Sequence, residues 1–268
     1  MSDPNKVAIV TGAGRRWGMG YQIALGLANK GLDIAVADIR EDWGKESVGA
    51  IKAETGRRAI FVKTDISKRA SVQAMVAAVA GEYGRIDALV NDAAIAPRAS
   101  VDEITDEHFD AVMNINFRGT VLCCQAVLPH LRKQGGGRIV NIASGGALEP
   151  LKGLGIYSAS KAAVIIFSKI LAREVARDNI VVTVVAPGVM HTAMGSESAP
   201  TPEEFERQGK HQPFKRPLYP AEVAEVVVYA ATHPTHVLTG QTLHANGGGY
   251  IFLTRGRGLF SFPSPIFL

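Results

Sequence analysis

Short apolar runs rich in β-branched residues alternate along the chain with longer stretches whose apolar residues have helical spacing. Strands are expected at Val7–Val10, Ile34–Ala37, Ile60–Val62, Ala88–Val90, Arg138–Ile142, Val181–Val185 and Gln241–Ala245. Helices are expected mainly at Tyr21–Lys30, Ser71–Tyr83, Phe109–Lys133 and Tyr157–Arg177. Continuous apolar strands separated by helices are typical of a parallel sheet covered on both faces. With right-handed crossovers, this order predicts a doubly wound α/β fold of the Rossmann type.

No linker rich in Pro, Gly or Ser divides the 268 residues, and no internal repeat is visible. We therefore expect a single domain over residues 1–268. Residues 188–217, rich in Pro and polar residues, are expected to form a lid inserted into this domain. Residues 250–268 lack a strand or helix pattern, and they fit either a tail docked on a neighbouring subunit or a loose end.

Composition narrows the class of protein further. Hydrophobic residues make up 47% and charged residues 20%, as in an ordinary soluble globular protein. The net charge of +4 is spread without a block of like charge, so we expect no nucleic-acid partner. The two cysteines, Cys123 and Cys124, are adjacent, which predicts neither a disulfide framework nor a metal site. With no signal peptide and no apolar stretch long enough to span a bilayer, a cytoplasmic location without membrane contact is expected.

The first expected strand leads into a glycine-rich turn, Thr11–Gly20, with glycines at Gly12, Gly14, Gly18 and Gly20. Glycines let the backbone turn tightly and approach a pyrophosphate, which then lies at the N-terminus of the following helix. The spacing departs from GxGxxG, and no Gly-Lys-Ser/Thr follows, so the turn is not a P-loop. Its position between a strand and a helix predicts a dinucleotide-binding site.

Asp38 ends the second expected strand, where a carboxylate can accept hydrogen bonds from the adenosine ribose and repel a 2′-phosphate. The alternative is that Asp38 only caps a helix beginning near Asp42. Arg15 and Arg16 instead favour NADP, because guanidinium groups at this place could pair with a 2′-phosphate. Both could equally be solvated loop residues. The sequence thus favours NAD as cofactor and leaves NADP open.

Tyr157 and Lys161 are four residues apart, on one face of an expected helix. The pKa of a free tyrosine is near 10, and a nearby cation lowers it, so the pair suits proton transfer. Ser144 follows the fifth expected strand, at the sheet edge where doubly wound folds bind ligands, and its hydroxyl could hold a substrate carbonyl. Asn116, in the long helix, could anchor a water next to Lys161.

Taken together, these motifs resemble the short-chain dehydrogenase/reductase family, single-domain type, over about residues 6–249. The resemblance maps a catalytic quartet of Asn116, Ser144, Tyr157 and Lys161. It implies cofactor contacts, besides Tyr157 and Lys161, at Gly12, Gly14, Arg16, Gly18, Gly20, Asp38, Asp65, Ile66, Asn91, Ala93, Pro187, Gly188, Val189 and Thr192.

The resemblance implies hydride transfer between NAD(P) and a secondary alcohol or ketone, with Tyr157 as general acid and base. Lys161 would lower the pKa of Tyr157, Ser144 would steady the carbonyl, and Asn116 would support a water relay. It also implies a homotetramer whose long helices, about residues 109–133 and 157–177, pack between subunits.

The chain departs from the family pattern in two places. The glycine-rich turn is two residues longer than usual, with Arg15, Arg16 and Trp17 between Gly14 and Gly18. Asp92 and Ala94 replace Asn and Gly in the motif that follows the fourth strand, a change expected to affect packing more than chemistry.

The substrate is expected to be a medium-sized secondary alcohol or ketone in a mainly apolar pocket. Candidate lining residues are Gly145, Gly146, Met190, His191 and Met194, although His191 could equally face water, and Lys152 is a weak candidate for an anionic group. One alternative is an NADPH-dependent 3-oxoacyl thioester reductase of the same family. Another, from a different class, is a dinucleotide-binding sensor or scaffold without turnover.

Overall fold

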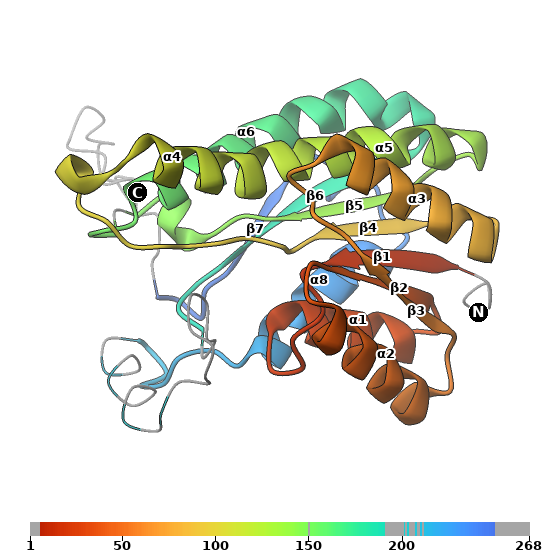
Figure 1. The fold of residues 1–268 in the computed structure, drawn as a ribbon, viewed down its shortest axis with the longest axis horizontal. Helices are drawn as coiled ribbons and strands as arrows, with labels where there is room; N and C mark the ends of the chain where they lie inside the picture. The colour runs from red at the N-terminus through yellow and green to blue at the C-terminus, as the bar shows by residue number, and fades with distance from the viewer. Residues whose placement is uncertain are drawn as a thin grey trace, which may run out of the picture.

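The computed structural model describes residues 6–149, 151–190 and 212–249, together with residues 201, 203, 207 and 210. In this part of the chain, seven parallel strands form one sheet in the order β3-β2-β1-β4-β5-β6-β7 (Figure 1). The strands are β1 Val7–Thr11, β2 Asp33–Asp38, β3 Ala59–Lys63, β4 Ala88–Asn91, β5 Gly137–Ile142, β6 Ile180–Pro187 and β7 Thr242–Ala245. The predicted strands and the doubly wound α/β fold are thereby confirmed.

Helices cover both faces of the sheet (Figure 1). One face carries α1 Met19–Asn29, α2 Glu41–Thr55 and α8 Pro220–Thr232. The other carries α3 Arg69–Tyr83, α4 Asp106–Val112, α5 Thr120–Lys133 and α6 Gly155–Val175. Short helical turns complete the chain at η1 Val101–Glu103, η3 Gly145–Ala147 and η4 Ala176–Asp178.

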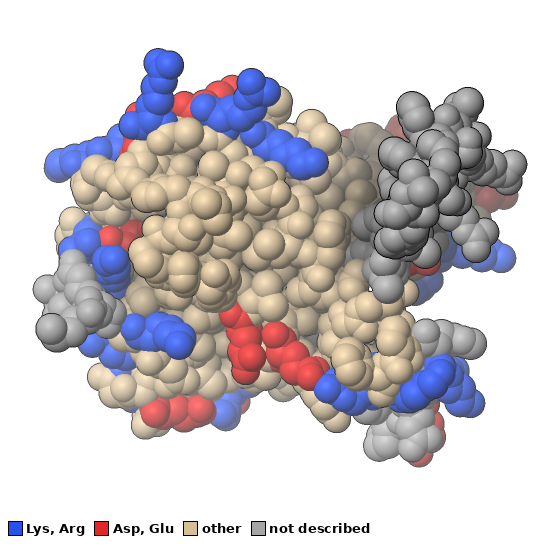
Figure 2. All heavy atoms as spheres, turned by 180° about the vertical axis from the view of Figure 1, so that it is seen from behind, with Lys and Arg blue, Asp and Glu red and all other residues tan. Residues whose placement is uncertain are grey.

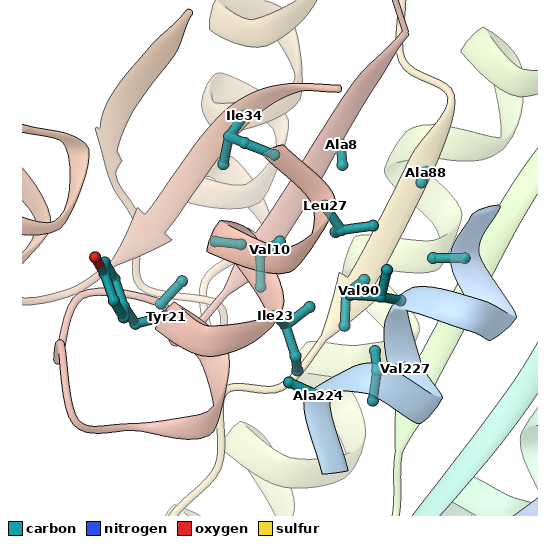
Figure 3. Close-up of a cluster of buried hydrophobic side chains, with 14 of the residues drawn as sticks. Ala8, Val10, Tyr21, Ile23, Leu27, Ile34, Ala88, Val90, Ala224 and Val227 are labelled. Atoms are coloured by element: carbon teal, nitrogen blue, oxygen red, sulfur yellow. The ribbon is translucent and has the colours of Figure 1, made fainter. Parts of the chain in front are cut away.

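Two apolar clusters, one on each face of the sheet, form most of the core. Alternate residues of β1 divide between them, so that Val10 packs with Leu27 of α1 and Val227 of α8 (Figure 3). Ile9 packs on the opposite face with residues of α3 and α5. This alternation follows from the side-chain period of two in a strand. It explains why the strands are apolar along their whole length.

The predicted long helix at 109–133 is a continuous helical run from Asp106 to Lys133, but it is not uniform. Between α4 and α5 the chain makes a π-helical segment, η2 Met113–Gly119. The wider π turn places an extra residue in the helix, and such turns are common at functional sites. Asn116 lies in this segment.

Two helical stretches have the length and composition of a membrane span, contrary to the expectation that none is long enough. They are Asp106–Lys133 and Gly155–Asp178, with mean hydropathy of 1.2 and 1.3. In each, 44% of the apolar window is buried within the domain. Core helices of soluble proteins have the same length and composition, because they too are apolar on the side that covers the sheet.

The strand order reverses between β1 and β4, whose residues Thr11 and Asn91 pair at the carboxyl ends of the strands. In open α/β sheets, ligands bind at the point of reversal. The glycine-rich turn follows β1, and the motif containing Asp92 follows β4, so both lie at this point. Most of the expected lid and the whole tail at 250–268 lie outside the described residues.

Core packing at α1 provides a test of this fold. Truncating the fully buried Leu27 to alanine is expected to lower the free energy of unfolding by about 3 kcal/mol, because the cavity cannot fully close. The matched control is Val237→Ala, at a side chain that is 78% exposed, for which a change below about 0.5 kcal/mol is expected. Urea unfolding followed by circular dichroism measures both. Equal destabilisation by the two substitutions would contradict the assigned core.

Candidate active site

The glycine-rich turn is folded tightly against the end of β4. A Cβ added at Gly12, where φ is +71°, would lie 2.7 Å from Cα of Ala93. A Cβ added at Gly20 would lie 2.4 Å from the carbonyl oxygen of Gly12. The extra residues between Gly14 and Gly18 close on themselves, since the Gly18 N–H donates to the Arg15 carbonyl at 2.9 Å. The longer turn is therefore accommodated without displacing the glycines that open the helix.

The N-terminus of α1 fits the pyrophosphate of a dinucleotide. Its cap residue, Gly18, provides no side-chain hydrogen bond, and its first turn contains no acidic residue. The first N–H groups of a helix lack partners within the helix and favour an anion. No side chain at the cap position thus competes with an anion, although the Gly20 N–H donates to the Asp92 carboxylate.

Asp38 is placed at the carboxyl end of β2, beside the turn. Its Oδ2 accepts a hydrogen bond from the Gly14 N–H at 2.9 Å, and its Oδ1 accepts one from the Arg40 N–H at 3.0 Å. A Cβ at Gly14 would lie 2.8 Å from Oδ2, so only glycine allows this contact. The alternative role of Asp38 as a helix cap is not observed, because the N-cap of α2 is Arg40.

Arg16, expected as a cofactor contact, pairs with acidic side chains of α2 in this structure. Its guanidinium forms ion pairs with Glu54 at 3.3 Å and Glu46 at 3.7 Å, both on α2. The two carboxylates attract the guanidinium to the outer face of α2. In this structure the Arg16 guanidinium is therefore engaged by α2.

Arg15 and Arg40 instead gather at the indole of Trp43. The Arg15 guanidinium lies 4.3 Å from the ring centroid of Trp43, and that of Arg40 lies 4.2 Å from it. Trp17 lies beside this group, 6.4 Å from Trp43 between centroids. Sequence reasoning missed this cluster, although a signal existed: the chain has only two tryptophans, and both are close to the glycine-rich turn.

Asp65, Ile66 and Asn91, also expected to contact the cofactor, each make a different kind of contact within the protein. Asp65 accepts hydrogen bonds from the Ser67 hydroxyl and N–H, and the pKa of its carboxyl is lowered mainly by that hydroxyl. Ile66 packs against Gly119 of η2. The side-chain amide of Asn91 donates to Asn141 at 2.8 Å within the sheet, so its structural role is to join β4 to β5.

Ser144, Tyr157 and Lys161 converge on a small cavity of about 120 Å³. Tyr157 and Lys161 are one turn apart on α6, and Ser144 follows β5 as the N-cap of η3. Lys161 is 2% exposed, and its Nζ donates to the Ile142 carbonyl at 2.8 Å. The predicted grouping of these three side chains is what the structure brings together. Pro187, Gly188 and Met190 line the same cavity, next to Met19 at the start of α1.

Asn116 is fully buried and acts on its surroundings through hydrogen bonds. Its Oδ1 accepts from the Ile95 N–H and its Nδ2 donates to the Ile95 carbonyl, both at 2.9 Å. Nδ2 also donates to the Ser160 hydroxyl at 3.1 Å, next to Lys161 in the chain. Asn116 thereby ties the loop after β4 to α6. Both N–H groups of its side-chain amide are thus used within the protein.

The pKa of Tyr157 is raised above its ordinary value, which corrects the expectation that Lys161 makes it low. Burial of the phenol is the main cause, because the charged phenolate loses water contact. A hydrogen bond with the Ser144 hydroxyl opposes this and lowers the pKa. Lys161 lies at 6.0 Å from the ring centroid, beyond direct contact with the ring.

A larger cavity of about 540 Å³ opens beside Ser144 and Tyr157. Gly145 and Gly146 line it as expected, together with Gly188, Val189, Leu151 and Leu154, whereas Met190 lines the smaller cavity. Its lining also includes polar side chains that were not predicted, namely Arg98, Glu149 and Gln212. The basic group at this cavity is Arg98, whose Nη1 donates to the carbonyl of Lys152, and not Lys152 itself. Thr192, His191 and Met194 lie outside the described residues.

Asp92, expected to affect mainly packing, belongs to the smaller cavity. Its carboxylate lines that cavity with Lys161 and Tyr157. Its backbone N–H donates to the Thr11 hydroxyl at 3.1 Å, and the carboxylate accepts a hydrogen bond from the Gly20 N–H. The substitution of Asn by Asp therefore introduces a charge next to the candidate catalytic groups.

Comparison with known proteins relates this chain to oxidoreductases. Residues 12–249 match the family described as enoyl-(acyl carrier protein) reductase. The short chain dehydrogenase/reductase astE of Aspergillus oryzae is 36% identical over 91% of this chain and 94% of its own. D-threitol dehydrogenase of Mycolicibacterium smegmatis is 37% identical over 91% of this chain and 92% of its own. The crystal structure of L-sorbose reductase from Gluconobacter frateurii, complexed with NADPH and L-sorbose, superposes with a TM-score of 0.87 at 29% identity, covering 93% of this chain and 98% of that one.

The chain belongs to the short-chain dehydrogenase/reductase family. It is an enzyme that uses a nicotinamide dinucleotide to interconvert alcohols and ketones.

The hydrogen bond between Ser144 and Tyr157 gives a testable prediction. In Ser144→Ala, the pKa of Tyr157 is expected to rise further, because the hydrogen bond that opposes burial is lost. Turnover is expected to fall by about 100-fold, the usual loss for one donor at a reacting oxygen. Ultraviolet titration of tyrosinate, corrected with Tyr157→Phe, measures the first effect, and steady-state kinetics the second. A pKa of Tyr157 that is unchanged or lower in Ser144→Ala would contradict the assigned contact.

Proposed function

We propose that this enzyme oxidises a secondary alcohol to a ketone, and reduces the ketone in reverse, with Tyr157 as the general base and acid. The observation that carries the proposal is the convergence of Ser144, Tyr157 and Lys161 on one cavity that also borders the start of α1. A hydroxyl donor, a phenol and a buried ammonium are the groups that proton transfer at a carbinol oxygen requires. When bound, the nicotinamide accepts or supplies the hydride.

Each side chain has a separate task in this scheme. In oxidation, the Tyr157 phenolate takes the proton of the substrate hydroxyl, and in reduction the phenol returns it. The Ser144 hydroxyl donates to the carbonyl oxygen as it forms and orients the substrate toward Tyr157. Lys161, held by the Ile142 carbonyl, supplies positive charge on the same side of the cavity. Asn116 fixes the loop after β4 and thus the shape of the cavity.

NAD is the proposed cofactor. Asp38, fixed by the N–H groups of Gly14 and Arg40, places a negative charge where a 2′-phosphate would lie. The commitment of Arg16 to Glu46 and Glu54 removes one guanidinium that could pair with that phosphate. Arg15 and Arg40, stacked on Trp43, are the groups through which NADP could still be accepted. The NADPH in the L-sorbose reductase structure makes this comparison worth measuring.

We propose a medium-sized substrate that carries polar groups besides the reacting hydroxyl. The larger cavity, about 540 Å³, combines leucine side chains with Arg98, Glu149 and Gln212. Such a lining suits a compound with further hydroxyl groups, in keeping with relatives named for D-threitol and L-sorbose. A 3-oxoacyl thioester remains the second candidate substrate, because the matching family is described as an enoyl-(acyl carrier protein) reductase, a name that implies an acyl thioester substrate.

We further propose a cytoplasmic homotetramer. The outer side of α6 exposes Ile166 and Ile170, which are 60% and 52% accessible, and α8 exposes Tyr229. Figure 2, which views the molecule from behind, has a broad area with few charged side chains. Burial of apolar side chains between subunits would account for their exposure here. The two buried free thiols, Cys123 and Cys124, agree with a reducing compartment.

The role of Tyr157 is tested by Tyr157→Phe, which removes only the hydroxyl. Turnover is expected to fall by about 10²–10⁴-fold, the usual contribution of a general acid or base. Cofactor affinity, measured by calorimetry, is expected to stay within about threefold, since the ring and its packing remain. In the wild type, the rate of oxidation should rise with pH toward the raised pKa of Tyr157, because the phenol keeps its proton below that value, while reduction is spared. Retention of full turnover by Tyr157→Phe would refute the proposal.

Cofactor choice is tested by calorimetric titration with NADH and NADPH. Wild-type enzyme is expected to prefer NADH. In Asp38→Ser, the preference should move toward NADPH by about tenfold or more, because a repulsive carboxylate is removed. Arg16→Ala serves as the control and is expected to change neither affinity by more than about twofold, since Arg16 is paired on the outer face of α2. A wild-type preference for NADPH would overturn the assignment of NAD.

A further inference from the structure

The small cavity beside the candidate catalytic groups contains a carboxylate that the proposed mechanism does not use. Asp92 is the acidic residue among the described side chains lining it, and Lys161 is the basic one. They reach the cavity from different elements: Asp92 from the end of β4, and Lys161 from α6. Both charged groups therefore border the space beside Tyr157 where the reaction is proposed to take place, and they interact electrostatically.

The position of Asp92 is fixed by its backbone and by its side chain. The Thr11 hydroxyl accepts hydrogen bonds from the N–H groups of Asp92 at 3.1 Å and Ala93 at 3.2 Å. Oδ2 lies close to α1, since a Cβ added at Gly20 would be 2.8 Å from it, and the Gly20 N–H donates to the carboxylate. The side chain cannot swing out to solvent without losing these contacts. The carboxyl group is therefore held at the cavity.

Lys161 needs a counter-charge in this position. It is 2% exposed, and its Nζ donates to a neutral acceptor, the Ile142 carbonyl. A buried ammonium without an opposite charge tends to lose its proton, because the neutral amine is less costly to desolvate. The neighbouring phenol of Tyr157 cannot supply a negative charge in its protonated form. Asp92 can.

We propose that Asp92 is a positioning residue for the dehydrogenase reaction, which keeps the Lys161 ammonium charged and so sets the upper pH limit of activity. The inference deepens the proposed function, on which its catalytic consequence rests. It also assigns a chemical role to the replacement of Asn by Asp after β4. A neutral Asn at this position would fill the same space and accept the same Gly20 N–H without supporting the charge.

Burial and the neighbouring charges act in opposite directions on the pKa values of this pair. Burial lowers the pKa of Lys161 to about 8, and Asp92 opposes that fall. Burial raises the pKa of Asp92 to about 7, Asp38 from β2 raises it further, and Lys161 opposes the rise. Asp92 also raises the pKa of Tyr157 on α6. Between these two pKa values both groups are charged, and at higher pH Lys161 loses its proton.

The test compares Asp92→Asn with Asp110→Asn, which removes the same charge from an exposed position on α4. Carbon-13 NMR of lysine Cε follows the ionisation of Lys161 in the protein without cofactor, the resonance being assigned by its loss in Lys161→Met. In Asp92→Asn, the pKa of Lys161 is expected to fall by about one pH unit. In Asp110→Asn it is expected to stay at the wild-type value. An unchanged Lys161 pKa in Asp92→Asn would overturn the inference.

Two further measurements separate this role from a structural one and from the proposed function itself. The alkaline limb of kcat/KM should move to lower pH in Asp92→Asn by the same amount, whereas a merely structural role would lower the rate equally at every pH. If Asp92→Asn fails to fold, the same NMR titration is made on the wild-type protein. The Lys161 resonance is then expected to shift twice, once on ionisation of Asp92 and once on ionisation of Lys161. A single titration step with the pKa of an ordinary lysine would refute the inference. The NMR measurement does not require turnover. Absence of alcohol oxidation would therefore refute the proposed function, whereas the effect of Asp92 on the pKa of Lys161 could still be measured.

Discussion

The close approach of the turn after β1 to the end of β4 is the constraint on which the rest of the site depends. Gly12 admits no Cβ because Ala93 occupies the space, and the Thr11 hydroxyl accepts N–H groups from Asp92 and Ala93. This contact brings the start of α1 and the motif after β4 to one point. The helix terminus for an anion and the carboxylate of Asp92 are consequences of the same contact.

A second set of buried polar contacts places α6 on the sheet. Asn91 donates to Asn141 at 2.8 Å, Asn141 donates to the Ser168 hydroxyl at 2.8 Å, and Ser168 donates to the Val164 carbonyl at 2.7 Å. Buried polar groups need partners with good geometry, so this relay specifies one axial position for the helix. Tyr157 and Lys161 lie on the same helix. Their position over the sheet is thus fixed from a site at some distance from the reaction.

The fold and the central part of the site follow from the sequence because both rest on local patterns. Apolar strands at regular intervals predicted the sheet, and the spacing of Tyr157 and Lys161 predicted a shared helix face. The direction of Arg16 could not be predicted, since it depends on Glu46 and Glu54, which are distant in sequence. The π segment at Asn116 and the raised pKa of Tyr157 were also hidden. Both reflect how completely neighbouring elements bury these residues, and that requires the three-dimensional structure.

The clustering of both tryptophans at one corner has a consequence for how this protein is observed. Trp17 lies within the glycine-rich turn, between Gly14 and Gly18, and Trp43 lies on α2 with two guanidinium groups over its ring. Emission from the protein therefore reports on one corner of the domain, whereas far-ultraviolet circular dichroism averages over all its helices and strands. If the turn loosens before the sheet does, the two signals will change at different denaturant concentrations. The chain thus contains a built-in optical probe of local opening at its cofactor turn, with no added label.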